Sequence, residues 1–251
     1  MNDLELYFKN NKSQQINKWE HYFEIYNRHF NKYREQELVV VEIGVFQGGS
    51  LQMWKHYFGP KVKIYGLDIN PMCKQFEEEN IKIFIGSQSD RAFLKKVASE
   101  IGPIDILIDD GGHSMKQQIT SFQEFFKHVK YGGVYLCEDT HTSYWLEFGG
   151  GYKRRGTFME FSKNLIDQLN AFHSQQHSLQ PTSFTSSTHS IHFYDSIVVI
   201  EKIERQKPKE VTTGLSSFEK GKDRTRKTIK YKILFLLNWL LRSVNLPSLK
   251  W

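Results

Sequence analysis

Cysteine is scarce in this sequence, and long apolar runs are missing from it. Cys73 and Cys137 lie 64 positions apart, and each falls in a segment typical of ordinary α/β structure. This spacing excludes a disulfide framework or a cysteine zinc site and favours a reducing compartment. No run reaches the roughly 18 apolar residues of a membrane span, and the N-terminus lacks the apolar stretch of a secretory signal. We therefore expect a cytoplasmic protein, in which only the C-terminal end leaves membrane association open.

Positive charge is concentrated at the C-terminal end. The chain has 34 Lys and Arg against 28 Asp and Glu, a formal net charge of +6. Residues 205–251 hold 12 of the basic residues and three acidic ones, a net of +9, which leaves −3 for residues 1–204. A main domain without a surplus of basic residues attracts nucleic acid weakly. We therefore expect no nucleic-acid partner.

Short β-rich runs alternate with helical segments from residue 38 onward. Strands are predicted at 38–44, 62–68, 81–86, 104–110 and 132–139, with two more inside 190–202 that meet at Tyr194 and Asp195. Helices are predicted at 49–58, 71–79, 90–101, 115–128 and 157–176. Such alternation is typical of a parallel sheet covered by helices on both faces. The expected fold is therefore α/β, with a seven-stranded, mostly parallel sheet.

The composition divides the chain into three parts. Residues 1–203 form the expected main domain, in which the aromatic segment 16–36 is predicted to be helical and to pack against the sheet. Residues 204–230 are polar, basic and without apolar periodicity, which predicts a flexible linker. Residues 231–251 contain a short helix that is apolar on most faces. This helix is predicted either to pack against the protein or a partner subunit, or to lie in a membrane interface, with Trp239 and Leu240 central in both cases.

A glycine-rich turn follows the first predicted strand. In "VVVEIGVFQGGS" the chain passes through Gly44 and Gly48 towards a helix, and glycines there let the backbone approach a ligand at the carboxyl end of a sheet. The pattern lacks the Lys of a phosphate-binding loop and the Gly-x-Gly-x-x-Gly spacing of dinucleotide sites. Glu42 would also repel a phosphate, but it suits a cationic, amino-acid-like ligand. We expect Glu42, Gly44, Gly48 and Ser50 to contact such a cofactor.

Polar residues end the next strands in the same way. Asp68 ends the second strand, where a carboxylate accepts hydrogen bonds from both hydroxyls of a ribose. Ser87 and Gln88 follow the third strand and are placed to contact an adenine edge, and Asp109 ends the fourth. Ribose and adenine without a phosphate describe S-adenosylmethionine, which is the predicted cofactor. The alternative for Asp68 is that it caps a helix before Pro71.

Four carboxylates and one imidazole fall at the ends of the fourth and fifth strands. They belong to Asp109, Asp110, His113, Glu138 and Asp139. If the strands are neighbours, this cluster repels itself unless a cation neutralises it, and Mg²⁺ is the simplest choice. Asp110, Glu138 and Asp139 are the predicted metal ligands, and His113 is the predicted general base. The alternative is a set of helix caps and surface ion pairs with a loop histidine.

These residues resemble those of a known family. "VVEIGVFQGGSLQMW", "YGLDINP", "GSQSD", "IDILIDDGGH" and "YLCEDTHTSYW" look like the S-adenosylmethionine- and Mg²⁺-dependent sugar O-methyltransferases typified by the macrocin and mycinamicin enzymes, over roughly residues 17–202. The resemblance implies the Rossmann-like class I methyltransferase fold and a homo-oligomer. It also implies metal ligation by Asp110, Glu138 and Asp139 and catalysis by His113. The acceptor it implies is a hydroxyl of a sugar or glycosylated substrate, and the motifs do not separate a macrolide sugar, a cell-surface glycan and a glycolipid.

Other parts of the chain have weaker interpretations. Residues 140–158 follow the acidic motif and are predicted to form a substrate loop, in which Lys153, Arg154 and Arg155 would meet an anionic substrate or simply face solvent. His141 is a candidate second base. Two other functions remain open from the sequence: a non-catalytic cofactor-binding or interaction protein on the same fold, and metal-assisted hydroxylation. The second is disfavoured because the motif lacks a two-histidine facial triad.

Overall fold

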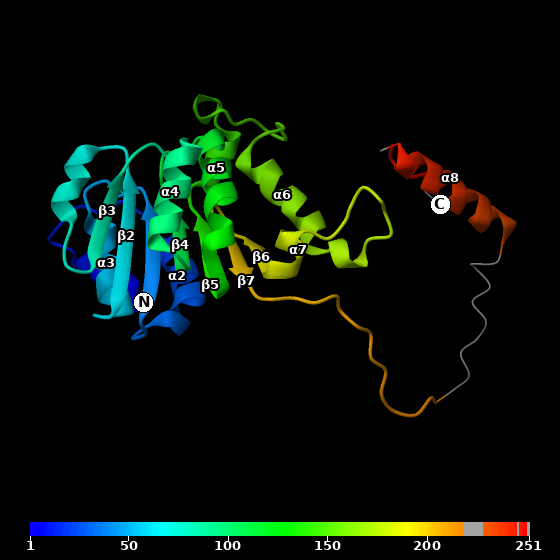
Figure 1. The fold of residues 1–251 in the computed structure, drawn as a ribbon, viewed down its shortest axis with the longest axis horizontal. Helices are drawn as coiled ribbons and strands as arrows, with labels where there is room; N and C mark the ends of the chain where they lie inside the picture. The colour runs from blue at the N-terminus through cyan, green and yellow to red at the C-terminus, as the bar shows by residue number, and fades with distance from the viewer. Residues whose placement is uncertain (218–227, 245, 250–251) are drawn as a thin grey trace.

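The computed structural model describes residues 1–217, 228–244 and 246–249. Its centre is one seven-stranded sheet in the order β3-β2-β1-β4-β5-β7-β6 (Figure 1). The strands are β1 (Leu38–Ile43), β2 (Val62–Asp68), β3 (Ile81–Ile85), β4 (Ile104–Asp109), β5 (Val129–Cys137), β6 (Thr188–Phe193) and β7 (Val198–Lys202). The first five strands pair in parallel, whereas β7 runs antiparallel to both β5 and β6. The predicted seven-stranded, mostly parallel sheet is confirmed.

Helices cover both faces of the sheet, as its apolar strands require. One face packs against α1 (Asp3–Asn10), α2 (Tyr22–Phe30) and α3 (Gly49–Phe58). The other packs against α4 (Arg91–Ile101), α5 (Met115–Phe125) and α6 (Phe158–Leu169), and Figure 1 looks onto α4 and α5 lying in front of the strands. Alternate residues of a strand point to opposite faces. In β1, for example, Val40 joins the first core and Val41 the second.

Short helices complete the main domain. The five-residue α7 spans Ser183–Ser187, and 3₁₀ turns lie at Asn31–Tyr33, Pro71–Phe76, Phe126–His128, Thr140–Tyr144, Leu146–Phe148 and Ala171–His173. The segment predicted as a helix at 71–79 is thus a 3₁₀ turn that begins at Pro71 and ends before Glu77. Asn70 caps it, because its side chain accepts a hydrogen bond from the backbone N–H of Met72 at 3.0 Å.

The N-terminal segment is anchored by aromatic side chains. Tyr22, Phe23, Tyr26 and Phe30 of α2 are each at most 2% exposed, and the ring of Tyr26 packs edge-on against Trp54 of α3. This confirms the prediction that the segment packs against the sheet. Between α1 and α2 the chain is irregular, and residues 15–18 cross the carboxyl end of the strands. Residues 15–18 therefore form part of the wall of the cleft at this edge of the sheet.

The C-terminal part of the chain lies outside the sheet. Residues 206–217 form no helix or strand and are largely exposed. The final helix, α8 (Ile229–Ser243), lies apart from the sheet in Figure 1. Within the described parts of the chain, no helix is long and apolar enough to cross a membrane. Residues 218–227, which fall in the predicted linker, and residues 245 and 250–251, which fall in the predicted C-terminal segment 231–251, lie outside the described residues.

Candidate active site

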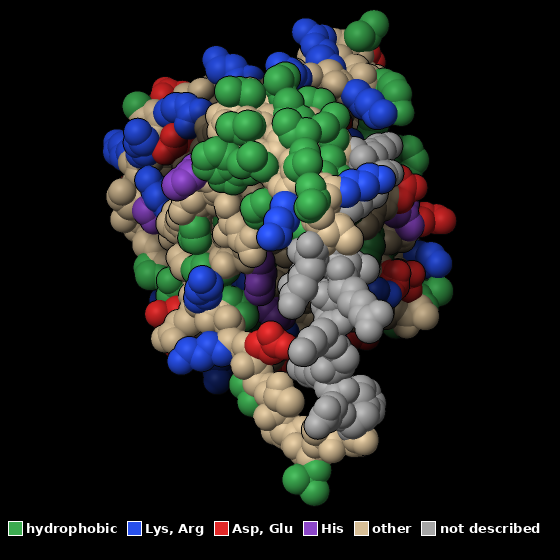
Figure 2. Space-filling model, turned by 90° about the vertical axis from the view of Figure 1, so that its right-hand side faces the viewer, with side chains coloured by type: hydrophobic (Ala, Val, Ile, Leu, Met, Phe, Trp, Pro, Cys, Tyr) green, Lys and Arg blue, Asp and Glu red, His purple; other side chains and the backbone are tan. Residues whose placement is uncertain are grey.

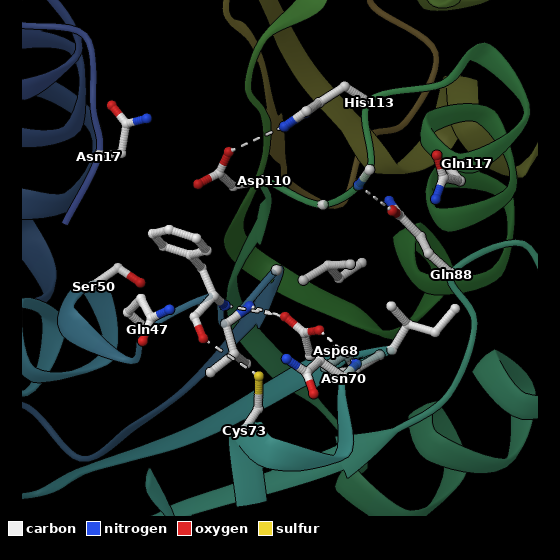
Figure 3. A pocket seen from close by; sticks show the side chains of 18 of the residues that line it. Asn17, Gln47, Ser50, Asp68, Asn70, Cys73, Gln88, Asp110, His113 and Gln117 are labelled. Atoms are coloured by element: carbon white, nitrogen blue, oxygen red, sulfur yellow. Dashed lines mark hydrogen bonds and ion pairs between the residues drawn. The ribbon is translucent and has the colours of Figure 1, made fainter. Parts of the chain in front are cut away.

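A cavity of about 500 Å³ opens at the carboxyl ends of β1, β2 and β4 (Figure 3). The strand order reverses between β1 and β4, and open α/β sheets bind their ligands beside that reversal. The cavity is lined by the turn after β1, the ends of β2 and β3, the loop after β4 and residues 15–18. The structure therefore brings together the glycine turn and the acidic motif, which are far apart in the sequence.

The glycine turn is pressed against the loop that follows β4. Gly44 has a φ of +95°, and a Cβ added there would lie 2.0 Å from the backbone oxygen of Asp110. Gly48 has a φ of +76°, and its Cβ would meet the ring of Phe76 at 2.6 Å. Both positions therefore need glycine for conformation and for space. The contact with Asp110 fixes the distance between the turn and the acidic loop.

Glu42 lies behind the cavity wall. Its carboxylate is fully buried and accepts hydrogen bonds from Ser50 Oγ at 2.7 Å and from Trp54 Nε1 at 3.0 Å. Burial raises the pKa of Glu42 to about 7. Ser50 lines the cavity, but Glu42 does not. Glu42 thus reaches a ligand through Ser50, or through the nearby lysine described below.

Asp68 is held rigidly at the end of β2 and lines the cavity. Its Oδ2 accepts hydrogen bonds from the backbone N–H groups of Val45 and Phe46 at 2.8 and 3.1 Å, and its Oδ1 accepts from that of Asn70 at 2.8 Å. These bonds use three of the roughly four lone-pair positions of the carboxylate, and one position on Oδ1 stays open. Asp68 is therefore both the acceptor that holds the glycine turn and an available acceptor for a ligand hydroxyl.

Gln88 and Asp109 form a buried pair behind the loop after β4. Gln88 Nε2 donates to Asp109 Oδ1 at 2.6 Å, and Gln88 Oε1 accepts from the backbone N–H of Gly112 at 2.9 Å. Tyr135 donates to the other oxygen of Asp109, and burial raises the pKa of Asp109 to about 7. Gln88 and Ser87 line the cavity, whereas Asp109 does not. Asp109 therefore positions Gln88 and the loop from behind.

Asp110, His113 and Asp139 converge on the other side of the cavity. His113 Nε2 lies 3.4 Å from Asp139 Oδ2 and 3.9 Å from Asp110 Oδ1. One potential ligand atom from each residue falls within 4.8 Å of the others. Tyr22 fixes Asp139 by donating to its Oδ1 at 2.6 Å. The two predicted carboxylates and the predicted base thus share one small region, half-open to the cleft.

Glu138 contacts Lys18, a residue that the sequence did not single out. Lys18 Nζ lies 2.9 and 3.0 Å from the two oxygens of Glu138, 2.5 Å from Asp110 Oδ2 and 4.0 Å from a Glu42 oxygen. The Lys18 and Glu138 side chains are 2% and 1% exposed. Burial opposes the charge on Lys18, but the facing carboxylates raise its pKa above the ordinary value. Lys18 is therefore a buried counter-charge for three acids.

His113 is held in an unusual backbone conformation. Its φ is +55°, that of Asp139 is +52°, and neither residue is glycine. Non-glycine residues in this region cost about 1–3 kcal/mol and are concentrated at functional sites. Thr142 Oγ1 donates to the backbone oxygen of His113 at 2.9 Å, and His113 Nδ1 is buried without a hydrogen-bond partner among the described residues. The surrounding fold thus holds the imidazole with Nε2 towards the carboxylates.

The donor set at this point fits a hard divalent cation. Mg²⁺ is commonly held by one or two carboxylates, with its other positions left to water or substrate oxygens. Asp110 and Asp139 offer such oxygens from half-exposed side chains. Glu138 would join them only after Lys18 releases it. The chemistry of the residues is therefore compatible with the predicted metal, with Asp110 and Asp139 most directly accessible.

The loop after the acidic motif places its basic residues elsewhere. Lys153, Arg154 and Arg155 are exposed and do not line the cavity. His141 lies nearer, with Nδ1 3.9 Å from Asp139 Oδ1 and hydrogen-bonded to Ser196 Oγ. Its ring packs against Trp145 at a centroid distance of 4.6 Å. His141 thus borders the cluster, and the three basic residues are placed to meet a substrate only outside the cavity.

The strand order and the cleft define a class I methyltransferase fold, and comparison with solved structures supports this assignment. The MycE methyltransferase from the mycinamycin biosynthetic pathway, in complex with Mg, SAH and mycinamycin VI, superposes with a TM-score of 0.74 at 35% identity, covering 81% of this chain and 54% of that one. A second crystal form, with Mg and SAH, superposes with a TM-score of 0.68 at 38% identity, covering 72% of this chain and 48% of that chain. The predicted fold class is confirmed.

Curated relatives agree with the structural match. The chain is 39% identical over 193 residues to demethylmacrocin O-methyltransferase from Streptomyces fradiae, covering 70% of this chain and 47% of the relative. It is 40% identical over 195 residues to mycinamicin VI 2''-O-methyltransferase from Micromonospora griseorubida, with the same coverage. The resemblance to this family, expected from the motifs, is confirmed. The chain spans about half the length of the curated relatives it matches. No protein-family model matches the chain.

Proposed function

We propose that the chain is an S-adenosylmethionine-dependent O-methyltransferase that methylates a hydroxyl of a sugar or glycosylated small molecule with the help of a divalent cation. One observation carries the proposal: the cavity beside the glycine turn adjoins the cluster of Asp110, His113 and Asp139 in a single cleft. A methyltransferase of similar fold, MycE from the mycinamycin biosynthetic pathway, was crystallised in complex with Mg, SAH and mycinamycin VI. Cofactor and cation sites in one cleft are what a metal-assisted methyl transfer needs.

The residues that line the cavity have distinct roles in cofactor binding. Asp68 accepts a hydrogen bond from a ribose hydroxyl, and Ser87 and Gln88 contact the adenine. Gly44 and Ser50 border the amino-acid end, where the nearby negative charge of Glu42 favours a cationic ligand. This assignment follows from the position of each residue on the cavity wall or directly behind it.

The other half of the cleft holds the acceptor. Asp110 and Asp139 would hold a divalent cation, with Glu138 as a third ligand when it is released from Lys18. When bound there, the cation lowers the pKa of an adjacent hydroxyl. His113 Nε2 accepts the proton of the acceptor hydroxyl, the oxygen forms a bond to the methyl carbon, and the bond from that carbon to the sulfonium breaks. The fixed backbone of His113 keeps its imidazole in place for this transfer.

A second function is favoured by one observation. The Lys18 ammonium already neutralises Asp110 and Glu138, which is the task assigned to the metal. A protein that binds the cofactor without turnover would show this arrangement permanently. Cofactor binding that never responds to a divalent cation would support this second function over the first.

The partners and location remain proposals. The acceptor belongs to the class of small-molecule or glycan hydroxyls. The expectations of a homo-oligomer, of a cytoplasmic location and of peripheral membrane contact through α8 come from the sequence. The exposed apolar face of α8 supports the last of these expectations, peripheral membrane contact.

Calorimetric titration with S-adenosylmethionine tests the cofactor half of the proposal. The chain is expected to bind the cofactor with a micromolar dissociation constant, and Asp68→Ala is expected to weaken binding about 10- to 100-fold, because it removes a charged acceptor for the ribose and the hydrogen bonds that hold the glycine turn. Asp167→Ala, an exposed aspartate of α6, is the control and should bind as the wild type does. No heat of binding from a folded wild-type chain would refute the proposal.

A further inference from the structure

The C-terminal helix α8 exposes an apolar face to solvent. Ile229, Ile233, Leu236 and Leu240 recur at intervals of four, three and four residues, and at about 100° per residue they share one side of the helix. Their exposed fractions are 76%, 54%, 57% and 48%. Figure 2 looks at the side of the molecule where α8 lies and shows hydrophobic side chains gathered there, with Lys and Arg at the edges. Such a patch on a protein surface marks an interaction site.

The opposite face of α8 already faces the rest of the protein. Tyr231, Leu234 and Asn238 are half-buried, and with Gln175 and Gln176 they line a small cavity of about 200 Å³. The helix is therefore oriented with one side towards the main domain and the apolar side outward. Leu236 and Leu240 are not available to the main domain in this orientation.

The charges beside the apolar face identify its partner. Lys230 and Lys232 lie on opposite flanks of the face, about 100° and 60° to either side of Ile229, and the sequence of α8 contains no Asp or Glu. Two copies of α8 packed face to face would bring these lysines together without a carboxylate from either helix to pair them. Anionic lipid headgroups supply the missing charge.

The length of α8 places it on the bilayer and not through it. Fifteen residues span about 22 Å, which is shorter than the roughly 30 Å hydrocarbon core. Phe235 and Trp239 are 59% and 52% exposed, but they lie outside the apolar face, on the side of the helix that lines the small cavity. We propose that α8, assisted by the basic residues around it, binds the chain peripherally to an anionic membrane surface. This proposal is independent of catalysis.

Flotation of the full-length protein with vesicles tests this proposal. We expect binding to vesicles of phosphatidylcholine with 30% phosphatidylglycerol (about this fraction provides a strong surface charge), weak binding to phosphatidylcholine alone, and a loss of affinity as salt increases. Leu236→Ser/Leu240→Ser should weaken binding at least about tenfold. Leu215→Ser, which changes a leucine that is 99% exposed outside the helix, is the matched control.

Charge reversal supplies the second comparison. Lys230→Glu/Lys232→Glu should also abolish binding to the anionic vesicles, whereas Lys95→Glu/Lys96→Glu on exposed positions of α4 should not. Vesicle binding that is unchanged in Leu236→Ser/Leu240→Ser would overturn the proposal. So would sedimentation that shows a dimer lost in that variant, with no vesicle binding by the wild type, because a second copy would then cover the face. Cofactor titration is measured separately, so failure of either proposal leaves the other intact.

Discussion

Asp110→Asn and Asp139→Asn are each expected to lower methyl transfer at least about 1,000-fold and to weaken Mn²⁺ binding about 10- to 100-fold. Each substitution removes a charged oxygen from the small group around His113 Nε2, and hard cations depend on such oxygens. Loss of the cation removes its effect on the hydroxyl pKa, and the geometry around the base is lost with it. Mn²⁺ binding followed by electron paramagnetic resonance checks the first effect, and transfer of a labelled methyl group checks the second.

Asp105→Asn is the matched control for this pair. Asp105 lies at the other end of β4, where it accepts from Lys130 Nζ at 2.9 Å and from the backbone N–H of Val39 at 2.8 Å. This substitution removes one carboxylate from the same strand without touching the cleft. Mn²⁺ binding that survives in both Asp110→Asn and Asp139→Asn would show that the cation site lies elsewhere.

Lys18→Met is expected to lower the free energy of unfolding by about 3–5 kcal/mol when no divalent cation is present. The substitution leaves Glu138 and Asp110 facing each other without the ammonium that lies 2.5–3.0 Å from their oxygens, and an unpaired buried charge has a cost of that size. Added Mg²⁺ should recover more of the lost stability in this variant than it adds to the wild type, because the cation replaces the missing charge. Urea unfolding with and without Mg²⁺ measures both effects.

Lys163→Met provides the comparison for Lys18. Lys163 pairs with Glu160 at 2.6 Å, but on an exposed part of α6, and such exposed pairs add little to stability. If Lys18→Met unfolds at the same urea concentration as Lys163→Met in the absence of Mg²⁺, the interpretation of Lys18 as the counter-charge of the acids is refuted.

Much of the fold was predictable because most strands are apolar, β-branched runs that can be recognised one at a time in the sequence. The apolar runs of β1 and β4 are buried on both faces, and those of β2 and β3 mainly on one. The boundaries of all four agree with the predicted ranges within one residue. The strand β5 begins at Val129, three residues before its predicted start, because Val129 pairs with Ile104 ahead of a register shift. A local pattern does not reveal such an irregular pairing, which depends on the neighbouring strand.

The sequence predicted which strand ends carry the residues of the candidate site, but it did not predict the direction in which each side chain points. Asp109 and Asp110 are adjacent, so they point to opposite sides of the strand: Asp109 turns to Gln88 and Tyr135, and Asp110 to the cleft. Glu138 and Asp139 are divided in the same way between Lys18 and the cleft. A sequence shows that acids gather at these ends, whereas the folded backbone decides which of them face the cavity.

Lys18 lay outside any motif, and this is why the sequence did not single it out. It lies in an irregular segment, 92 positions from Asp110 and 120 from Glu138. Its role depends on the path of residues 15–18 across the sheet, which is fixed by the aromatic anchors of α2 and by the close contact of Gly49 with the backbone of Gln14 and Gln15. The sequence showed that acidic residues gather at the strand ends, but it did not show that Lys18 neutralises them.

The crystal structure of the chain grown with SAH and Mn²⁺ tests the central claim most directly. The claim is that one cleft holds the cofactor and the cation side by side. The expected result is cofactor density in the cavity with the ribose at Asp68, and an anomalous manganese peak between Asp110 and Asp139. Manganese bound away from both carboxylates, or cofactor density outside the cavity, would contradict it.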